Sequence, residues 1–516
     1  MADNTSQSDE HSLTEDHTAS RSGLGGVLQY LYAAALGSYL CGAITEPDFY
    51  FHLLNGRWIS AHRTLPTTDI WTSALKGQRW YSESWLFDFL LSSTEDRFGW
   101  TGLAVFKIGL CILFVVALTS VLSRISGSRF FGGVLATVVA CGTLEQAPFG
   151  PELFAYPLFT LLVGTALFAR ERSRLTSFEW VSVALCTLFL ANAHASFFLL
   201  LCCAVLFGLK DPAKTVWMIV LLLCAALFVT PYAGSQIPFL ATSLFARGRF
   251  YLQSQGGAAT VFDYSFSFLL LLWFLAAFIG LAKRDSRRLP AELLLAGAVS
   301  LIALAVKFLL PFALILTGLV CAGVWASARL ETRPKEIVVS FERLEQSLLR
   351  LPAVGVAWIL FCVLVVNSAN FVRRPSVDLL LPKLALDYVL ERKLPFPLWN
   401  ESAVGPYVMY RLADERGEPR ELTAVDPRAV PEHSEIFFEE SKGLWKASFS
   451  RVMPHTILVR ANTGLYESLA ANPSFHLVFQ AGEEVLPAER QNKVEKPPFY
   501  AWAVFTDANL EPKSAL

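Results

Sequence analysis

Long apolar runs, separated by short charged segments, recur from residue 24 to residue 370 of the 516-residue chain. A helix needs about 20 apolar residues to cross the hydrocarbon core of a bilayer, and most of these runs approach that length. The chain is 54% hydrophobic and 17% charged, whereas a soluble domain has roughly 45–50% and about 25%. We therefore expect a polytopic α-helical membrane protein with about eleven transmembrane helices. The expected spans are 24–45, 100–122, 130–147, 153–169, 178–193, 195–209, 215–232, 264–282, 290–307, 309–328 and 352–370.

The loops between these spans differ in charge, and the difference predicts an orientation. Every second loop is basic, as in 283–288 and 329–350, whereas opposite loops such as 145–152 hold few positive charges. Cytoplasmic loops collect Lys and Arg. The polar tail 1–23, which we expect to be disordered, is therefore predicted to be cytoplasmic. With eleven spans, the C-terminal part is then extracytoplasmic.

The organisation expected from composition is a transmembrane domain over 24–370 and a small soluble α/β domain over 371–516. Pro, Glu and Asp become common after the last span, and short strand patterns alternate with helical ones. The predicted strands are 396–400, 421–425, 455–460, 475–480 and 499–505, and the predicted helices are 378–392 and 462–471. The extracytoplasmic loop 46–99 is predicted to hold amphipathic helices over 48–60 and 81–97, and a further amphipathic helix is expected over 329–351 on the inner surface.

The sequence lacks the motifs that several classes of protein require. The chain has no phosphate-binding loop, no Gly-x-Gly-x-x-Gly, no His-Glu-x-x-His and no Gly-x-Ser-x-Gly, which argues against nucleotide-driven transport, zinc proteolysis and lipase activity. The net charge of −1 gives no reason to expect nucleic acid as a partner. All nine cysteines lie inside apolar runs without a Cys-x-x-Cys pair, so we expect them to pack between helices rather than bind a metal.

The densest polar segment follows the first span, where Glu46, Asp48 and His52 occur within seven residues. Pro47 ends the first helix, and Asp48 and His52 are four residues apart, so they share one face of a helix that follows. A carboxylate at a membrane boundary loses hydration and can act as a general base toward a hydroxyl. The competing interpretation is that Glu46 and Asp48 only cap the helix. Spacing alone favours the cap.

Other polar residues are expected on the same extracytoplasmic side. Ionisable residues within a membrane are costly and are treated as functional hypotheses. Lys307 could neutralise a phosphate or could snorkel to the interface, and we expect Lys107 to snorkel. The remaining candidates for substrate binding are Asp69, Arg79, Asn192, His194 and Tyr232.

An ordered series of motifs resembles a large group of bacterial membrane proteins with a GT-C-type glycosyltransferase architecture. Each motif is weak alone, and their order along residues 40–505 carries the resemblance. The motifs are Glu46-Pro47-Asp48-Phe49-Tyr50-Phe51-His52-Leu53, Gly56-Arg57-Trp58-Ile59, Pro66-x-x-Asp69, Ala191-Asn192-Ala193-His194, Thr230-Pro231-Tyr232-Ala233 and Val425-Asp426-x-Arg428.

The resemblance implies extracytoplasmic transfer of a sugar from a polyprenyl-phosphate-linked donor to a glycan, lipid or protein, by a multi-pass protein of the bacterial inner membrane. It implies Asp48 as the base, with Glu46 second, and assigns Lys307, Arg79 or His52 to the lipid phosphate. A divalent metal is left open. Two alternatives also stay open: a non-catalytic scaffold that presents 371–516 to an envelope protein, and a transporter of a lipid-linked substrate.

Overall fold

The structure is a computed structural model. It describes residues 26–42, 44, 47–73, 76–144, 149–172, 175–194, 214–235, 264–281, 291–305, 309–329, 353–373, 381–424, 452–461, 463–480, 483–485 and 501–509, with a few single residues between them.

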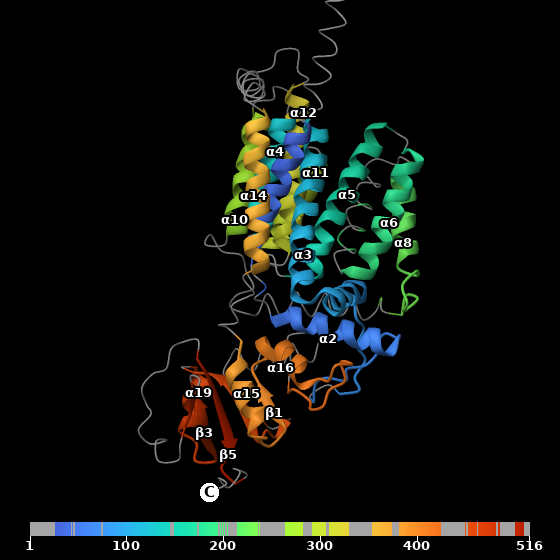
Figure 1. The fold of residues 1–516 in the computed structure, drawn as a ribbon. Helices are drawn as coiled ribbons and strands as arrows, with labels where there is room; N and C mark the ends of the chain where they lie inside the picture. Colours follow the sequence, from blue (N-terminus) through green and yellow to red (C-terminus); the bar gives the residue numbers. More distant parts are fainter. Residues whose placement is uncertain are drawn as a thin grey trace, which may run out of the picture.

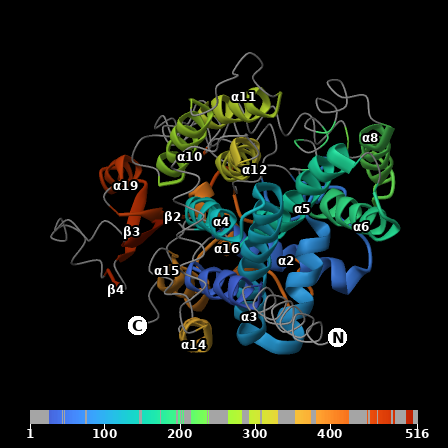
Figure 2. The same cartoon turned by 90° about the horizontal axis from the view of Figure 1, so that it is seen from above.

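A bundle of roughly parallel helices forms the larger part of the molecule (Figure 1). Seen from above in Figure 2, α12 lies inside the bundle, and it packs against α3, α4, α5, α10 and α11. Nearly all of α12 is buried, which fits an apolar helix surrounded by other helices. Beside a helix over 26–39, the bundle consists of α3 (Trp85–Ser126), α4 (Arg129–Leu144), α5 (Pro151–Arg172), α6 (Ser177–Ala193), α8 (Lys214–Ala226), α10 (Tyr264–Leu281), α11 (Ala291–Ala305), α12 (Leu310–Arg329) and α14 (Ala353–Arg373).

Three helices of the described residues are long and apolar enough to cross a membrane, and they identify a membrane protein by length and composition. These are Trp85–Ser126, Pro151–Phe168 and Leu310–Arg329. Every other expected span except 195–209 also coincides with a helix, but those helices are shorter, less apolar or only partly described. The number eleven therefore stays a prediction. The span 195–209 and the expected inner-surface helix 329–351 lie largely outside the described residues, as does the tail 1–23.

Helix α3 joins two segments that the sequence treats separately. The predicted helix 81–97 and the predicted span 100–122 correspond to two helices on either side of a kink inside α3. They meet at Gly99, whose φ of 58° and ψ of −153° break the helical geometry inside the element. Only glycine adopts such angles readily, because it has no Cβ. The kink lets the first turns of α3 leave the direction of the span.

Helix α2 (Pro47–His62) confirms that a helix forms over the predicted segment 48–60, although it is buried on two sides rather than amphipathic. It lies across one end of the bundle, between the bundle and the C-terminal elements (Figure 1). Phe49, Tyr50, Phe51, Leu53 and Leu54 are all buried, because one side of the helix packs on α3 and the other on α16 (Gly405–Leu412).

The C-terminal part contains a small mixed sheet with the strand order β1-β2-β5-β3-β4. Strand β1 pairs with β2 in parallel, and the other pairs are antiparallel. The strands are β1 (Leu398–Asn400), β2 (Thr456–Arg460), β3 (Phe475–Gln480), β4 (Glu483–Glu484) and β5 (Trp502–Asp507), with α15 (Lys383–Glu391), η2 (Ser402–Val404) and α19 (Gly464–Ala470) beside them. These match the predicted helices and four of the predicted strands. In place of the fifth, 421–425, Thr423 only bridges Leu398 and Thr72.

The C-terminal part docks directly on α2 and on the loop between α2 and α3. Gly417 packs against the backbone of α2 at Trp58, and its carbonyl accepts a hydrogen bond from Trp71 Nε1 at 3.1 Å. Arg57 forms a bidentate pair with Glu95 of α3 and lies 4.8 Å over the ring of Tyr410. The polar residues around His52 and Asp88 thus lie between α2, the end of the bundle and the loop that the C-terminal part contacts.

Candidate functional site

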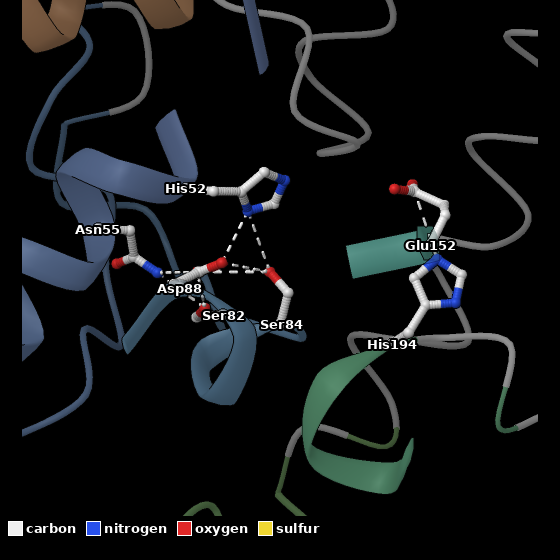
Figure 3. A network of polar contacts seen from close by, with 7 residues as sticks. All are labelled: His52, Asn55, Ser82, Ser84, Asp88, Glu152 and His194. Carbon is white, nitrogen blue, oxygen red and sulfur yellow. Dashed lines mark hydrogen bonds and ion pairs between the residues drawn. The ribbon is translucent and has the colours of Figure 1, made fainter. Parts of the chain in front are cut away.

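A fully buried carboxylate, Asp88, forms the centre of the polar cluster (Figure 3). It lies in the first turn of α3, next to the close approach of α2 at Gly56. The amide of Asn55 and the hydroxyls of Ser82 and Ser84 donate hydrogen bonds to its two oxygens. A carboxylate that accepts several such bonds is stabilised in its ionised form, even away from water.

His52 pairs with Asp88 through Nδ1, at 2.7 Å from Oδ1. The side chain of His52 is 15% exposed and that of Asp88 is not exposed. Burial alone would lower the pKa of the imidazole, but the Asp88 carboxylate, together with Glu152 and Asp48, raises the pKa of His52 above its ordinary value. The second ring nitrogen lies away from Asp88, on the side where Figure 3 shows Glu152 and His194.

A second imidazole–carboxylate pair lies opposite the first. His194 ends α6, with its Nε2 3.7 Å from Oε1 of Glu152 at the start of α5. His194 is 8% exposed, and its ring stacks on Phe312 of the central helix α12. The charge of Glu152 acts on His52, so the two pairs belong to one electrostatic cluster.

The other predicted residues are placed around this cluster with different roles. Asn192 accepts a hydrogen bond from Trp85 Nε1 at 2.9 Å, which ties the end of α6 to the start of α3. The hydroxyl of Tyr232 accepts from the Ser82 amide and donates to the carbonyl of Pro66. Both residues thus support the loop and helix ends that carry the cluster.

Two loop residues lie apart from the cluster. The Asp69 carboxylate is buried and accepts hydrogen bonds from the backbone of Trp71 and Thr72 and from the Thr72 hydroxyl. It therefore stabilises the loop turn. Arg79 is exposed, in an isolated bridge with Thr68. No contact of either residue with His52 or Asp88 is present among the described interactions.

Asp48 is exposed in the first turn of α2, one turn before His52. A carboxylate there is also favoured by the positive end of the helix, so the position suits both interpretations of the sequence. Glu46 and Lys307 lie outside the described residues. Lys107, expected to snorkel, is instead only 2% exposed, with its Nζ 5.9 Å from the ring centre of Phe149. Its helix is covered on that side by other parts of the chain.

Five residues of the cluster were given no catalytic or binding role from the sequence: Asn55, Ser82, Ser84, Asp88 and Glu152. Asn55 follows His52 by three residues and so shares its helix face, which is a signal that spacing could have provided. Asp88 and Glu152 had no such signal, because only the packing of α2, α3 and α5 brings them together. Among the described residues no group of three or more His, Cys, Asp or Glu side chains is arranged to hold a metal ion.

No protein-family model matches the chain, and no curated protein matches it significantly.

Proposed function

We propose that this chain is an extracytoplasmic membrane glycosyltransferase. It passes a sugar from a polyprenyl-phosphate-linked donor to a hydroxyl of a glycan, lipid or protein acceptor. The observation that supports this most is the position of Asp48 one helical turn before His52 on α2, with His52 oriented by the buried Asp88 carboxylate. The proposal includes a GT-C-like bundle of about eleven spans in the bacterial inner membrane, with a cytoplasmic N-terminus.

Each of the two residues fits one half of the reaction. Asp48 is exposed and can take the proton of an acceptor hydroxyl as that oxygen attacks the anomeric carbon. His52, with its raised pKa, presents an imidazolium N–H to the lipid phosphate that leaves, as a charge-assisted donor. Lys307 and Glu46 remain candidates for a further cation and a second carboxylate.

The position of the cluster also suits a lipid-borne donor. The cluster lies where α2 crosses the bundle end (Figure 1), and a polyprenyl chain in the bilayer would bring its phosphate to the membrane boundary. The C-terminal part, which contacts α2 through Gly417 and Tyr410, is in a position to hold an acceptor beside the cluster.

A complementation experiment tests the proposal. In cells that lack the chain, we expect the wild type and Asp96→Asn to restore the surface glycans, and Asp48→Asn to behave like the empty vector. Asp96 is an exposed carboxylate of α3 and serves as the matched control. Restoration by Asp48→Asn at equal protein level would exclude Asp48 as the base and favour the scaffold function.

A further inference from the structure

We propose, on the basis of the proposed function, that Asp48, His52 and Asp88 form a proton circuit. Asp48 takes the proton of the acceptor hydroxyl, and His52 gives a proton to the departing phosphate. Asp88 is a positioning residue that touches neither substrate. Two kinds of observation support the circuit: the contacts of His52 and the charged groups that face it.

Only one nitrogen of His52 can exchange protons with a substrate. Nδ1 lies 2.7 Å from Asp88 Oδ1 and 3.4 Å from the Ser84 hydroxyl. A carboxylate in this position keeps the proton on Nδ1 and fixes the orientation of the ring. Nε2 is therefore the nitrogen that meets substrate, on the side that Figure 3 shows opposite Asp88.

The Asp88 carboxylate is surrounded by hydrogen-bond donors. Asn55 uses its side-chain amide N–H groups on Asp88 and Ser82, while its own buried Oδ1 has no hydrogen-bond partner among the described residues. Leaving a buried carbonyl unsatisfied is unfavourable. The reverse orientation of the amide would place Oδ1 against a carboxylate oxygen, so the arrangement indicates that stabilising the Asp88 charge dominates.

Charged groups from α2 itself and from the neighbouring helices face His52. Asp88 belongs to α3, Asp48 to α2 itself, and Glu152 to the start of α5, where His194 pairs with it. The three carboxylates act on His52 in the same direction, against burial. These charges therefore favour the imidazolium form of His52.

The two proton transfers are coupled because Asp48 and His52 are close to each other. Side chains four residues apart on a helix have Cβ atoms about 5–6 Å apart, so Asp48 and His52 influence each other. When Asp48 accepts the proton of the acceptor, its charge disappears and the imidazolium is held less strongly. At that moment the departing phosphate oxygen gains negative charge and becomes the better acceptor for the Nε2 proton.

The bonds and protons balance in this circuit. The acceptor O–H bond breaks as its oxygen bonds to the anomeric carbon, and the bond from that carbon to the phosphate oxygen breaks. The acceptor proton goes to Asp48, and the Nε2 proton of His52 goes to the phosphate. Transfer of the proton from Asp48 to His52 then restores both groups, so no external acid, base or metal is required.

The test is the pH dependence of turnover by the purified protein in nanodiscs. The probe is a radiolabelled polyprenyl-phosphate sugar with membrane extract as acceptor. We expect the wild-type rate to fall as pH rises through the pKa of His52, and Asp88→Asn to move that fall to lower pH. His52→Gln should lower the rate by about 10²–10⁴-fold, the usual contribution of a general acid, and remove the fall. Asp96→Asn should match the wild type.

The outcomes separate the circuit from the function that it rests on. Wild-type transfer with a pH limb that neither Asp88→Asn nor His52→Gln changes overturns the circuit and leaves the glycosyltransferase standing. Wild-type protein that transfers no sugar overturns both. If Asp88→Asn does not fold, His52→Gln decides alone, because a retained high-pH limb in that variant is incompatible with His52 as the acid.

Discussion

Gly56 sets the distance between α2 and α3, and its replacement is the sharpest structural test of the cluster. A Cβ added at Gly56 would lie 2.0 Å from the carbonyl oxygen of Asp88 and 2.8 Å from the Ser92 hydroxyl. Ordinary contact begins at 3.4 Å, so relief requires a movement of about 1.4 Å, the difference between 3.4 Å and 2.0 Å. The nearest atom belongs to the backbone and cannot rotate away.

The size of the effect follows from that clash. Overpacking a well-packed contact costs about 1–3 kcal/mol, while alanine gains about 0.5–1 kcal/mol over glycine inside a helix. Because a backbone atom is struck, we take the upper values, which leave a net destabilisation of about 2 kcal/mol. The same movement would stretch the 2.7 Å contact between His52 and Asp88 beyond the roughly 3.2 Å limit of a hydrogen bond.

Thermal unfolding in nanodiscs, followed by tryptophan fluorescence, measures the stability, and sugar transfer measures the site. Gly109→Ala is the matched control, because Gly109 is also helical and a Cβ there meets nothing within 4 Å. We expect Gly56→Ala to unfold at lower temperature and lose transfer, and Gly109→Ala to be slightly stabilised and active. Equal stability and equal transfer in the two variants would refute the close approach of α2 and α3.

Three further predictions concern the surroundings of the cluster. Gly417→Ala should be less stable than Gly77→Ala in thermal unfolding, since both have φ near +80° but only Gly417 would place a Cβ against α2, at 2.8 Å; equal losses would contradict the docking. The free energy that the wild type gains over His52→Gln should be full below the unfolded pKa of His, about 6.5, and should be lost as pH rises through the raised folded pKa, as measured by unfolding across pH; a gain that grows with pH would refute the ion pair. Trp85→Phe should cost about 1–3 kcal/mol by leaving the Asn192 oxygen unsatisfied, and an unchanged unfolding temperature would contradict that bond.

The elements of the fold follow well from sequence pattern, for identifiable reasons. The helix over 48–60 and the strands near 455–460 and 475–480 are local, because period and turn residues are enough to place them. The break between the helix predicted over 81–97 and the span predicted over 100–122 is local too, because the non-helical angles of Gly99 separate the two within α3. The segment 421–425 has strand composition, but Thr423 gains only isolated bridges, one to Thr72 in the loop and one to Leu398 of β1.

The site was predicted only in part, because a sequence shows helical spacing but does not show which helices pack together. The shared face of Asp48 and His52 follows from helical spacing, whereas their carboxylate neighbours do not. Asp88 is 36 residues from His52 in sequence, and Glu152 is farther still, so only the packing of α3 and α5 against α2 reveals them. Asp69 appeared as a substrate residue because its type and loop position suggest one, but its hydrogen bonds serve the turn.

The central claim is that Asp48 drives sugar transfer from a lipid phosphate donor. The most direct test measures how fast label passes from a panel of radiolabelled polyprenyl-phosphate sugars to the acceptor. The purified proteins compared are the wild type, Asp48→Asn and Asp96→Asn. We predict that the wild type and Asp96→Asn transfer at equal rates and that Asp48→Asn is slower by about 10²–10⁴-fold. Equal transfer by all three proteins would contradict the claim.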